Sequence, residues 1–129
     1  MLRTEFEYNA TSDVIVRREA VSAGREAVTL YDYDGNRNLA GITRPEGNRV
    51  EMRHDPENRV TAVIRAANVP ADRSEARRQY DPDGNLVKSW IEGASFDTTI
   101  EYDDCGRVKC VKRWSGMSVR WICFERDED

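Results

Sequence analysis

Hydrophobic and polar positions alternate in short runs along the chain, and most runs end at an aromatic residue that a polar segment follows. The paired positions, two residues apart, are Phe6 and Tyr8, Tyr31 and Tyr33, Met52 and His54, Ile100 and Tyr102, and Ile122 and Phe124. A period of two places such side chains on one face of a β-strand. The pattern therefore predicts short strands with one apolar face, separated by turns.

The polar segments are copies of one motif, whose clearest example is Tyr-Asp-Pro-Asp-Gly-Asn-Leu at residues 80–86. The first residue of each copy is called the anchor here, and later positions are counted from it. Anchors at residues 8, 33, 54, 80 and 102 are 25, 21, 26 and 22 residues apart, and a further step of 22 reaches Phe124. A recurring period of this kind indicates a repeat architecture.

Each copy predicts a β-hairpin. The residue at +1 can accept a backbone hydrogen bond from two residues on, and Gly84 and Gly106 at +4 supply the positive φ that ends the turn. The aspartates assigned to turns in this way are Asp34, Asp55, Asp81 and Asp103. In the second copy, Gly35 and Asn36 suggest a slightly earlier turn. Apolar residues at +6 and +9 break strict alternation, which predicts a bulge or marked twist in each second strand.

The recurring Tyr-Asp-x-x-Gly-Arg/Asn-Leu/Val motif resembles the RHS, or YD, repeat from about Phe6 to Trp114, with Phe124 as a weak final copy. The signature residues are Tyr33, Asp34, His54, Asp55, Tyr80, Asp81, Gly84, Tyr102, Asp103 and Gly106. The resemblance implies antiparallel sheets that spiral into hollow shells, as in bacterial polymorphic toxins, insecticidal toxin-complex components and teneurins, and it also implies carbohydrate binding. Five or six hairpins are too few to enclose another domain.

We therefore expect an all-β fold of consecutive antiparallel hairpins forming one curved, open or partly wrapped sheet. A single domain is expected over residues 1–124, followed by an acidic tail at residues 125–129. Val14–Ala23 and Pro70–Gln79 also contain good helix formers, so a helical turn remains open in the second segment. Open arrays expose edge strands, which predicts caps near Phe6 and Trp121 or a homodimer formed through sheet edges.

Composition and charge limit the classes of function that we expect for this chain. A hydrophobic fraction of 39% with 34% charged residues indicates a folded domain with a charged exterior. The net charge of −4, of which four acids and Arg126 in the tail contribute −3, argues against a nucleic-acid clamp. No apolar run approaches a membrane span, and the N-terminus does not open a signal peptide. We expect a cytoplasmic protein if the chain stands alone, and a secreted or cell-surface location if it is a fragment of a larger RHS protein.

No constellation of side chains predicts catalysis, so neither enzyme activity nor a cofactor or metal site is expected. His54 is the only histidine and occupies an anchor position, which favours a packed ring over a catalytic role. The three cysteines, Cys105, Cys110 and Cys123, are an odd number and are expected as reduced thiols without a disulfide. The spacing of the first two lacks a second ligand pair for zinc, and the Asp-rich turns lack the closing Glu of a calcium loop.

Trp90, Trp114 and Trp121 have two interpretations: core or end-cap packing, or an exposed platform for sugar rings or a protein partner. Two functions remain open. The chain is either a non-catalytic RHS/YD-repeat module in structure or protein and glycan binding, or a small cytosolic immunity protein that neutralises a cognate RHS-type toxin. The expected partners are a toxin, further YD-repeat segments or a glycan, with no nucleic acid and no membrane.

Overall fold

The computed structural model describes residues 3–125 and divides the chain into two compact units, an N-terminal unit of residues 1–74 and a C-terminal unit of residues 75–129. The strands of the N-terminal unit are β1 (Thr4–Tyr8), β2 (Val14–Ser22), β3 (Arg25–Tyr33), β4 (Leu39–Thr43), β5 (Arg49–His54) and β6 (Val60–Arg65). Those of the C-terminal unit are β7 (Ser74–Tyr80, starting at the unit boundary), β8 (Leu86–Ile91), β9 (Asp97–Tyr102), β10 (Val108–Trp114) and β11 (Val119–Cys123).

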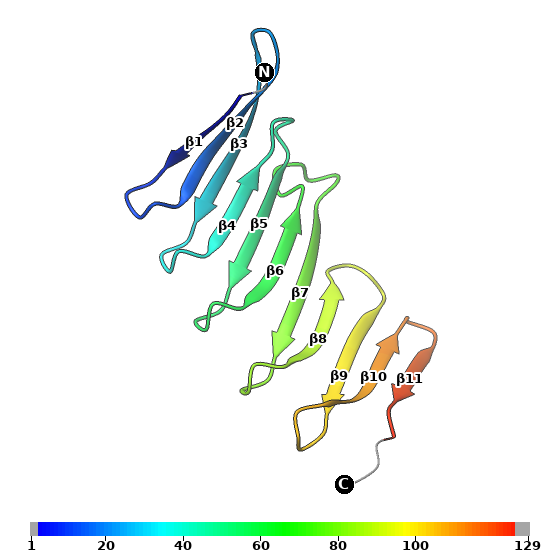
Figure 1. Cartoon of the computed structure of the whole chain (residues 1–129). Helices are drawn as coiled ribbons and strands as arrows, with labels where there is room; N and C mark the ends of the chain where they lie inside the picture. The colour runs from blue at the N-terminus through cyan, green and yellow to red at the C-terminus, as the bar shows by residue number, and fades with distance from the viewer. Residues whose placement is uncertain (1–2, 126–129) are drawn as a thin grey trace. The chain divides into compact units, whose positions relative to one another are not determined.

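Within each unit the strands pair antiparallel in chain order, and the sheet is open rather than closed into a barrel (Figure 1). The predicted all-β fold of consecutive antiparallel hairpins is confirmed. The described residues contain no helix, so the two segments with helix-forming composition are strand and loop: Val14–Ala23 supplies β2, and the end of Pro70–Gln79 lies in β7. No helix that could cross a membrane is found among residues 3–125. Of the predicted acidic tail, residues 126–129 lie outside the described part.

Each of the five described repeat hairpins carries one extra residue in its second strand. In the second copy, Asp32 lies opposite Gly41 and Tyr33 opposite Leu39, which leaves Ala40 as the bulge. The same shift occurs beside the anchors at residues 8, 54, 80 and 102. The predicted bulge is confirmed, and it explains the spacing of three: the extra residue returns the side chains at +6 and +9 to the face of the anchor.

All five turns close with the same two backbone bonds: the N–H at +1 donates to the carbonyl at +5, and the N–H at +4 donates to the carbonyl at +1. The residue at +4 has a positive φ in every copy, as seen at Ser12, Arg37, Asn58, Gly84 and Gly106. The expectation of an earlier second turn is wrong, because Arg37 itself takes φ 65°. Its guanidinium bonds Asp13 and the Thr11 carbonyl of the preceding turn, which offsets the strain of this conformation.

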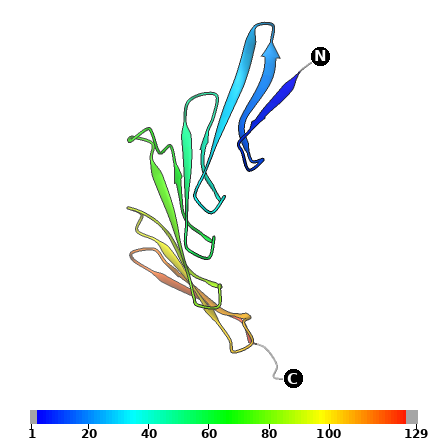
Figure 2. The ribbon, with the colours of Figure 1, turned by 90° about the vertical axis from the view of Figure 1, so that its left-hand side faces the viewer.

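Each unit is a single layer of strands (Figure 2). Among residues 3–125 the buried apolar side chains are Ala62, Ile64 and Cys110, and Glu75 is the buried charged one. A sheet without a second layer buries little of either face. A chain of this length would ordinarily be stabilised by a larger core. Here much of that stability comes instead from cross-strand side-chain pairs, hydrogen bonds within the turns and a disulfide.

Cys110 and Cys123 form a disulfide, and Cys105 is a free, exposed thiol. The expectation of three reduced cysteines is therefore wrong. The reason is strand register: β10 and β11 place Cys110 directly opposite Cys123, with Cα atoms 4.1 Å apart. The two cysteines are 13 positions apart in sequence, so no local spacing marks them as partners.

Gly106→Ala is expected to lower the free energy of unfolding by about 1–2 kcal/mol, because an L-residue pays this amount in the left-handed region that Gly106 occupies at φ 75°. A Cβ at Gly106 or at Gly35 meets no atom within 4 Å, so steric clash contributes at neither site. Gly35 lacks a positive φ, which makes Gly35→Ala the matched control with no loss expected. Urea unfolding measures both variants, and equal losses would contradict the turn assignment.

Candidate functional site

The three tryptophans lie on one face of the C-terminal unit. Trp90 in β8 and Trp114 in β10 both lie opposite Asp97 in β9, and Trp121 in β11 lies opposite Lys112. Cross-strand partners share a face, as do residues two apart on one strand, so these side chains project to the same side. We define the tryptophan face as Lys88, Trp90, Asp97, Lys112, Trp114 and Trp121.

Cations flank the rings of this face. Lys88 Nζ lies 5.4 Å from the Trp90 ring centroid, and Lys112 Nζ lies 4.9 Å from that of Trp121. Lys88 also forms an ion pair with Asp97 at 3.5 Å. Trp114 and Trp121 are 44% and 52% exposed, which is too open for core packing. The geometry favours an accessible aromatic platform.

Between two of the tryptophans lies a shallow pocket of ≈ 220 Å³, lined by Trp90, Phe96 and Trp114 together with Lys88 and Asp97. Aromatic rings stack against apolar faces of sugars or side chains, while the ammonium and carboxylate groups can bond hydroxyls. No three His, Cys, Asp or Glu side chains in the described part of the chain converge to hold a metal ion.

The anchor side chains link successive hairpins. The Tyr33 hydroxyl donates to the Val14 carbonyl at 2.8 Å, and the Tyr102 hydroxyl donates to the Leu86 carbonyl at 2.7 Å. Both acceptors are the +6 residue of the preceding copy. Burial raises the pKa of Tyr33, which keeps its hydroxyl protonated as a donor. Tyr80 occupies the same anchor position at the end of β7.

His54 takes the anchor position of the third copy but does not form this link. Its side chain is 9% exposed, and among the described residues its buried Nδ1 has no hydrogen-bond partner, the Asp34 carboxylate lying 3.7 Å away. The carbonyl equivalent to the acceptors above belongs to Leu39. His54 is therefore a packed ring at a position where the repeat favours a tyrosine hydroxyl.

His54→Tyr is expected to raise the free energy of unfolding by about 1 kcal/mol, the typical net contribution of one hydrogen bond, because the new hydroxyl can reach the Leu39 carbonyl. His54→Phe is the matched control, since it supplies the ring without the hydroxyl. Thermal unfolding of both variants measures the difference. Equal stability of the two variants would contradict the inter-hairpin link at this position.

The carboxylates of the aspartates at +1 accept hydrogen bonds from backbone N–H groups of their own turns. Asp34 Oδ1 accepts the N–H groups of Asn36 and Asn38, each at 2.9 Å, and Asp81 Oδ1 accepts that of Asn85 at 2.8 Å. Asp55 Oδ1 makes the equivalent pair of bonds in the third copy. The N–H of the +5 residue holds the pKa of Asp34 and Asp81 below its ordinary value. A carboxylate kept ionised in this way is a turn acceptor, poorly suited to proton transfer near neutral pH.

Acid is expected to destabilise the chain. The Arg37 guanidinium lowers the pKa of Asp13 from 3.8 to about 2, and the pKa values of the +1 aspartates are lowered as well. A carboxyl group whose pKa is lower in the folded state than in the unfolded state stabilises the fold at pH values above the unfolded pKa, about 3.9. This stabilisation is lost as the pH falls through the folded-state pKa. Melting temperatures by circular dichroism should thus fall between about pH 4 and about pH 2, with a shallower fall in Asp13→Asn. A flat profile would contradict the turn bonds.

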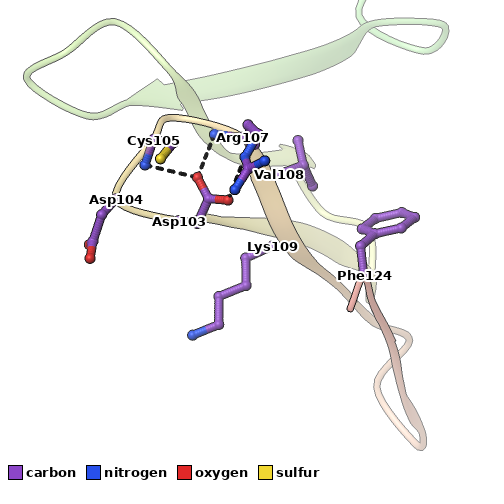
Figure 3. A pocket seen from close by; sticks show the side chains of 7 residues that line it. All are labelled: Asp103, Asp104, Cys105, Arg107, Val108, Lys109 and Phe124. Carbon is purple, nitrogen blue, oxygen red and sulfur yellow. Dashed lines mark hydrogen bonds and ion pairs between the residues drawn. The ribbon is translucent and has the colours of Figure 1, made fainter. Parts of the chain in front are cut away.

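A second pocket, of ≈ 370 Å³, lies beside the fifth turn and is lined by residues of that turn and by Phe124 (Figure 3). Asp103 Oδ1 accepts the N–H groups of Cys105 and Arg107 at 3.0 and 2.9 Å, and Oδ2 accepts Arg107 Nε at 2.9 Å. The N–H of Arg107 is the main cause of the lowered pKa of Asp103. The exposed thiol of Cys105 also lines this pocket.

In the N-terminal unit, successive turns contact one another. Arg37 of the second turn bonds Asp13 of the first at 2.7 Å, and Asn38 Nδ2 donates to Asn58 Oδ1 of the third at 2.8 Å. The pocket beside the fifth turn lies next to Phe124, the weak sixth anchor.

No family model matches the sequence, and no curated protein matches it either. Among solved structures, 87% of this chain matches one chain of the crystal structure of TcdB2-TccC3-Cdc42, with a TM-score of 0.67 and 15% sequence identity. The match covers 6% of that chain. At this identity the likeness shows a shared β-repeat fold, which there forms a small part of a far longer polypeptide.

Proposed function

We propose that the chain is a non-catalytic RHS/YD-repeat β module, related to the shells of bacterial polymorphic toxins, that acts in structure and in binding a protein or glycan partner. The observation that carries this proposal is the identical closure of five turns with a positive φ at +4 in each. The fold likeness to a stretch of a much longer chain supports it. As part of a larger RHS-type protein, the module would be secreted or displayed at the cell surface.

The signature residues support a structural role. Their carboxylates bond the backbone of their own turns, and the anchor hydroxyls of Tyr33 and Tyr102 bond the preceding hairpin. These carboxylates and hydroxyls already make hydrogen bonds that hold the fold together, and they recur from copy to copy. An active site, in contrast, ordinarily occurs once in a chain. Function then depends on the surfaces that the sheet presents.

The tryptophan face is the surface best suited to a partner. It combines three aromatic rings with two lysines and one aspartate, and two of its rings are about half exposed. Aromatic residues with a polar handle dominate binding energies at protein interfaces and stack on sugar rings. A protein or glycan would bind across β8–β11 by covering these rings.

A double variant Trp90→Ala/Trp114→Ala is expected to weaken partner binding roughly a hundredfold, since two hot-spot rings each contribute about 1–2 kcal/mol or more. A glycan array and a pull-down with neighbouring toxin or YD-repeat proteins provide the readout, with circular dichroism confirming the fold. Phe6→Ala is the control, because Phe6 is a similarly exposed ring in the N-terminal unit. Unchanged binding in the double variant would refute the role of this face.

The immunity-protein alternative predicts a different result in cells. A structural module should not rescue cells that express an RHS-type toxin encoded beside its gene, whereas an immunity protein should. Co-expression with that toxin and counting of surviving colonies separates the two functions. Protection by the chain would replace the module proposal with the immunity function.

A further inference from the structure

β11 is an anchor-type strand, meaning a strand that leads directly into an anchor residue, here Phe124. The anchor-type strands β3 and β9 each pair with a strand on both sides. β11 pairs with β10 through Val119–Cys123, and within the described part of the chain no strand pairs with its other side. The C-terminal unit therefore ends in a sheet edge of the type that elsewhere receives a second strand.

The hydrogen-bond pattern identifies which backbone groups this edge presents. Phe124 N donates to Lys109 O at 2.9 Å, and Ser115 N donates to Ser118 O at 3.0 Å. Hydrogen-bonded pairs alternate along an antiparallel ladder. Ile122 and Arg120 therefore direct their peptide groups to β10, while Val119, Trp121 and Cys123 direct theirs away. Such a row of outward N–H and C=O groups is a template for another strand.

The first strand in the sheet order, β1, is an edge strand that is protected by charge. β1 contains Glu5 and Glu7, which form ion pairs with Arg3 and Arg18. Charged side chains on an edge strand discourage pairing with other chains. The two edges thus differ in the feature that controls strand addition.

β11 carries one charged side chain, that of Arg120. Its Val119, Trp121 and Ile122 are 40%, 52% and 56% exposed, and Phe124 just beyond is 49% exposed. The Cys110–Cys123 disulfide fixes β11 to β10, so the edge is held in a strand conformation before any partner arrives. Exposed apolar side chains on a preorganised edge mark a contact surface.

We propose that β11 is a docking edge for an antiparallel strand of another polypeptide that has the second-strand pattern of the repeat. The inference rests on the proposed function and names its partner class. In the register of the described hairpins, the +6 residue pairs with the anchor and the +9 residue with the position two before it. An incoming strand would thus place apolar side chains opposite Phe124 and Ile122. The residues that fill the +6 position in this chain are Val14, Leu39, Val60, Leu86 and Val108.

The test uses a fluorescein-labelled peptide of residues 58–67, which carries the β6 sequence with valines at +6 and +9, titrated with the full chain by fluorescence anisotropy. Saturable binding is expected. Val119→Pro removes one outward N–H without removing a bond to β10 and should weaken binding roughly tenfold. Phe6→Pro is the matched control: Ala20 N donates to Arg3 O, so the Phe6 peptide group faces outward from β1, and binding should not change. Circular dichroism verifies the fold of both variants.

Three results would overturn the proposal. The first is no saturable binding up to about 1 mM protein, the limit of a weak specific complex. The second is equal binding by the wild type and Val119→Pro. The third is a β11-dependent dimer in analytical ultracentrifugation without peptide binding, which would assign the edge to a second copy of this chain. None of these results bears on the Trp90→Ala/Trp114→Ala experiment, so failure of the docking edge and failure of the proposed function are distinguishable.

Discussion

Cys123→Ser is expected to lower the free energy of unfolding of the C-terminal unit by about 3 kcal/mol, the usual effect of removing a disulfide that closes a loop of this size. The bond links residues 13 apart and holds the terminal strand β11. All five residues of β11 are exposed, so little burial compensates for the lost cross-link. The strand should therefore open locally before the rest of the unit unfolds.

Hydrogen–deuterium exchange of the Arg120 and Ile122 amides, which face β10 in the antiparallel ladder, measures this opening directly. Exchange should be fast in Cys123→Ser and in wild type treated with a dithiol reductant, and slow in the oxidised wild type. Cys105→Ser is the matched control, because it removes the free thiol and leaves the disulfide in place. Slow exchange in Cys123→Ser would show that the β10–β11 ladder holds the strand without the disulfide.

Ile64→Ala is expected to cost about 3 kcal/mol, within the range for truncating a buried isoleucine. Ile64 is 1% exposed and is the most completely buried large side chain among the described residues. In a single-layer sheet with few buried groups, this cost is a large share of the total stability. Urea unfolding at equilibrium measures the change.

Ile122→Ala provides the comparison, since Ile122 is 56% exposed and its truncation should cost less than about 1 kcal/mol. The two variants delete the same atoms, so the difference between them reports burial alone. Similar costs at both positions would contradict the burial of Ile64. A loss at Ile122 larger than that at Ile64 would place the stabilising contacts at the edge strand.

The hairpins could be predicted from sequence because their determinants are local. Aspartate at +1, glycine at +4 and apolar residues at +6 and +9 specify the turn and the bulge within about ten residues of each anchor. The second turn was mispredicted because glycine content alone suggested its position. Arg37 tolerates a positive φ there through bonds to Asp13 and Thr11 of the neighbouring turn, a contact that local sequence does not contain.

The disulfide and the tryptophan face depend on register between strands. The Cys110–Cys123 pair follows from the return turn between Ser115 and Ser118, which carries no YD motif. The same register brings Trp121 beside Lys112 and onto the face of Trp90 and Trp114. The late position of two tryptophans in their hairpins was visible in the sequence, but their grouping with the third was not.

Helix propensity left an alternative open that the strand pairing decides. Val14–Ala23 contains residues that form helices well, yet it begins with the β-branched residues Val14, Ile15 and Val16, and pairing with β1 and β3 decides in favour of β2. Propensity is a weak prior that tertiary pairing overrides. Local turn chemistry was informative in this chain, whereas local helix propensity was not.

One hairpin type recurs five times in the described residues, even where the motif has decayed. Nuclear magnetic resonance tests it at Ser12, Arg37 and Asn58, the three non-glycine residues at +4. A positive φ brings each amide proton close to its own Hα, so a strong intraresidue amide-to-Hα NOE is predicted at all three positions. A weak NOE at any of them, typical of a negative φ, would contradict the equivalence of the copies on which the fold and the proposed function rest.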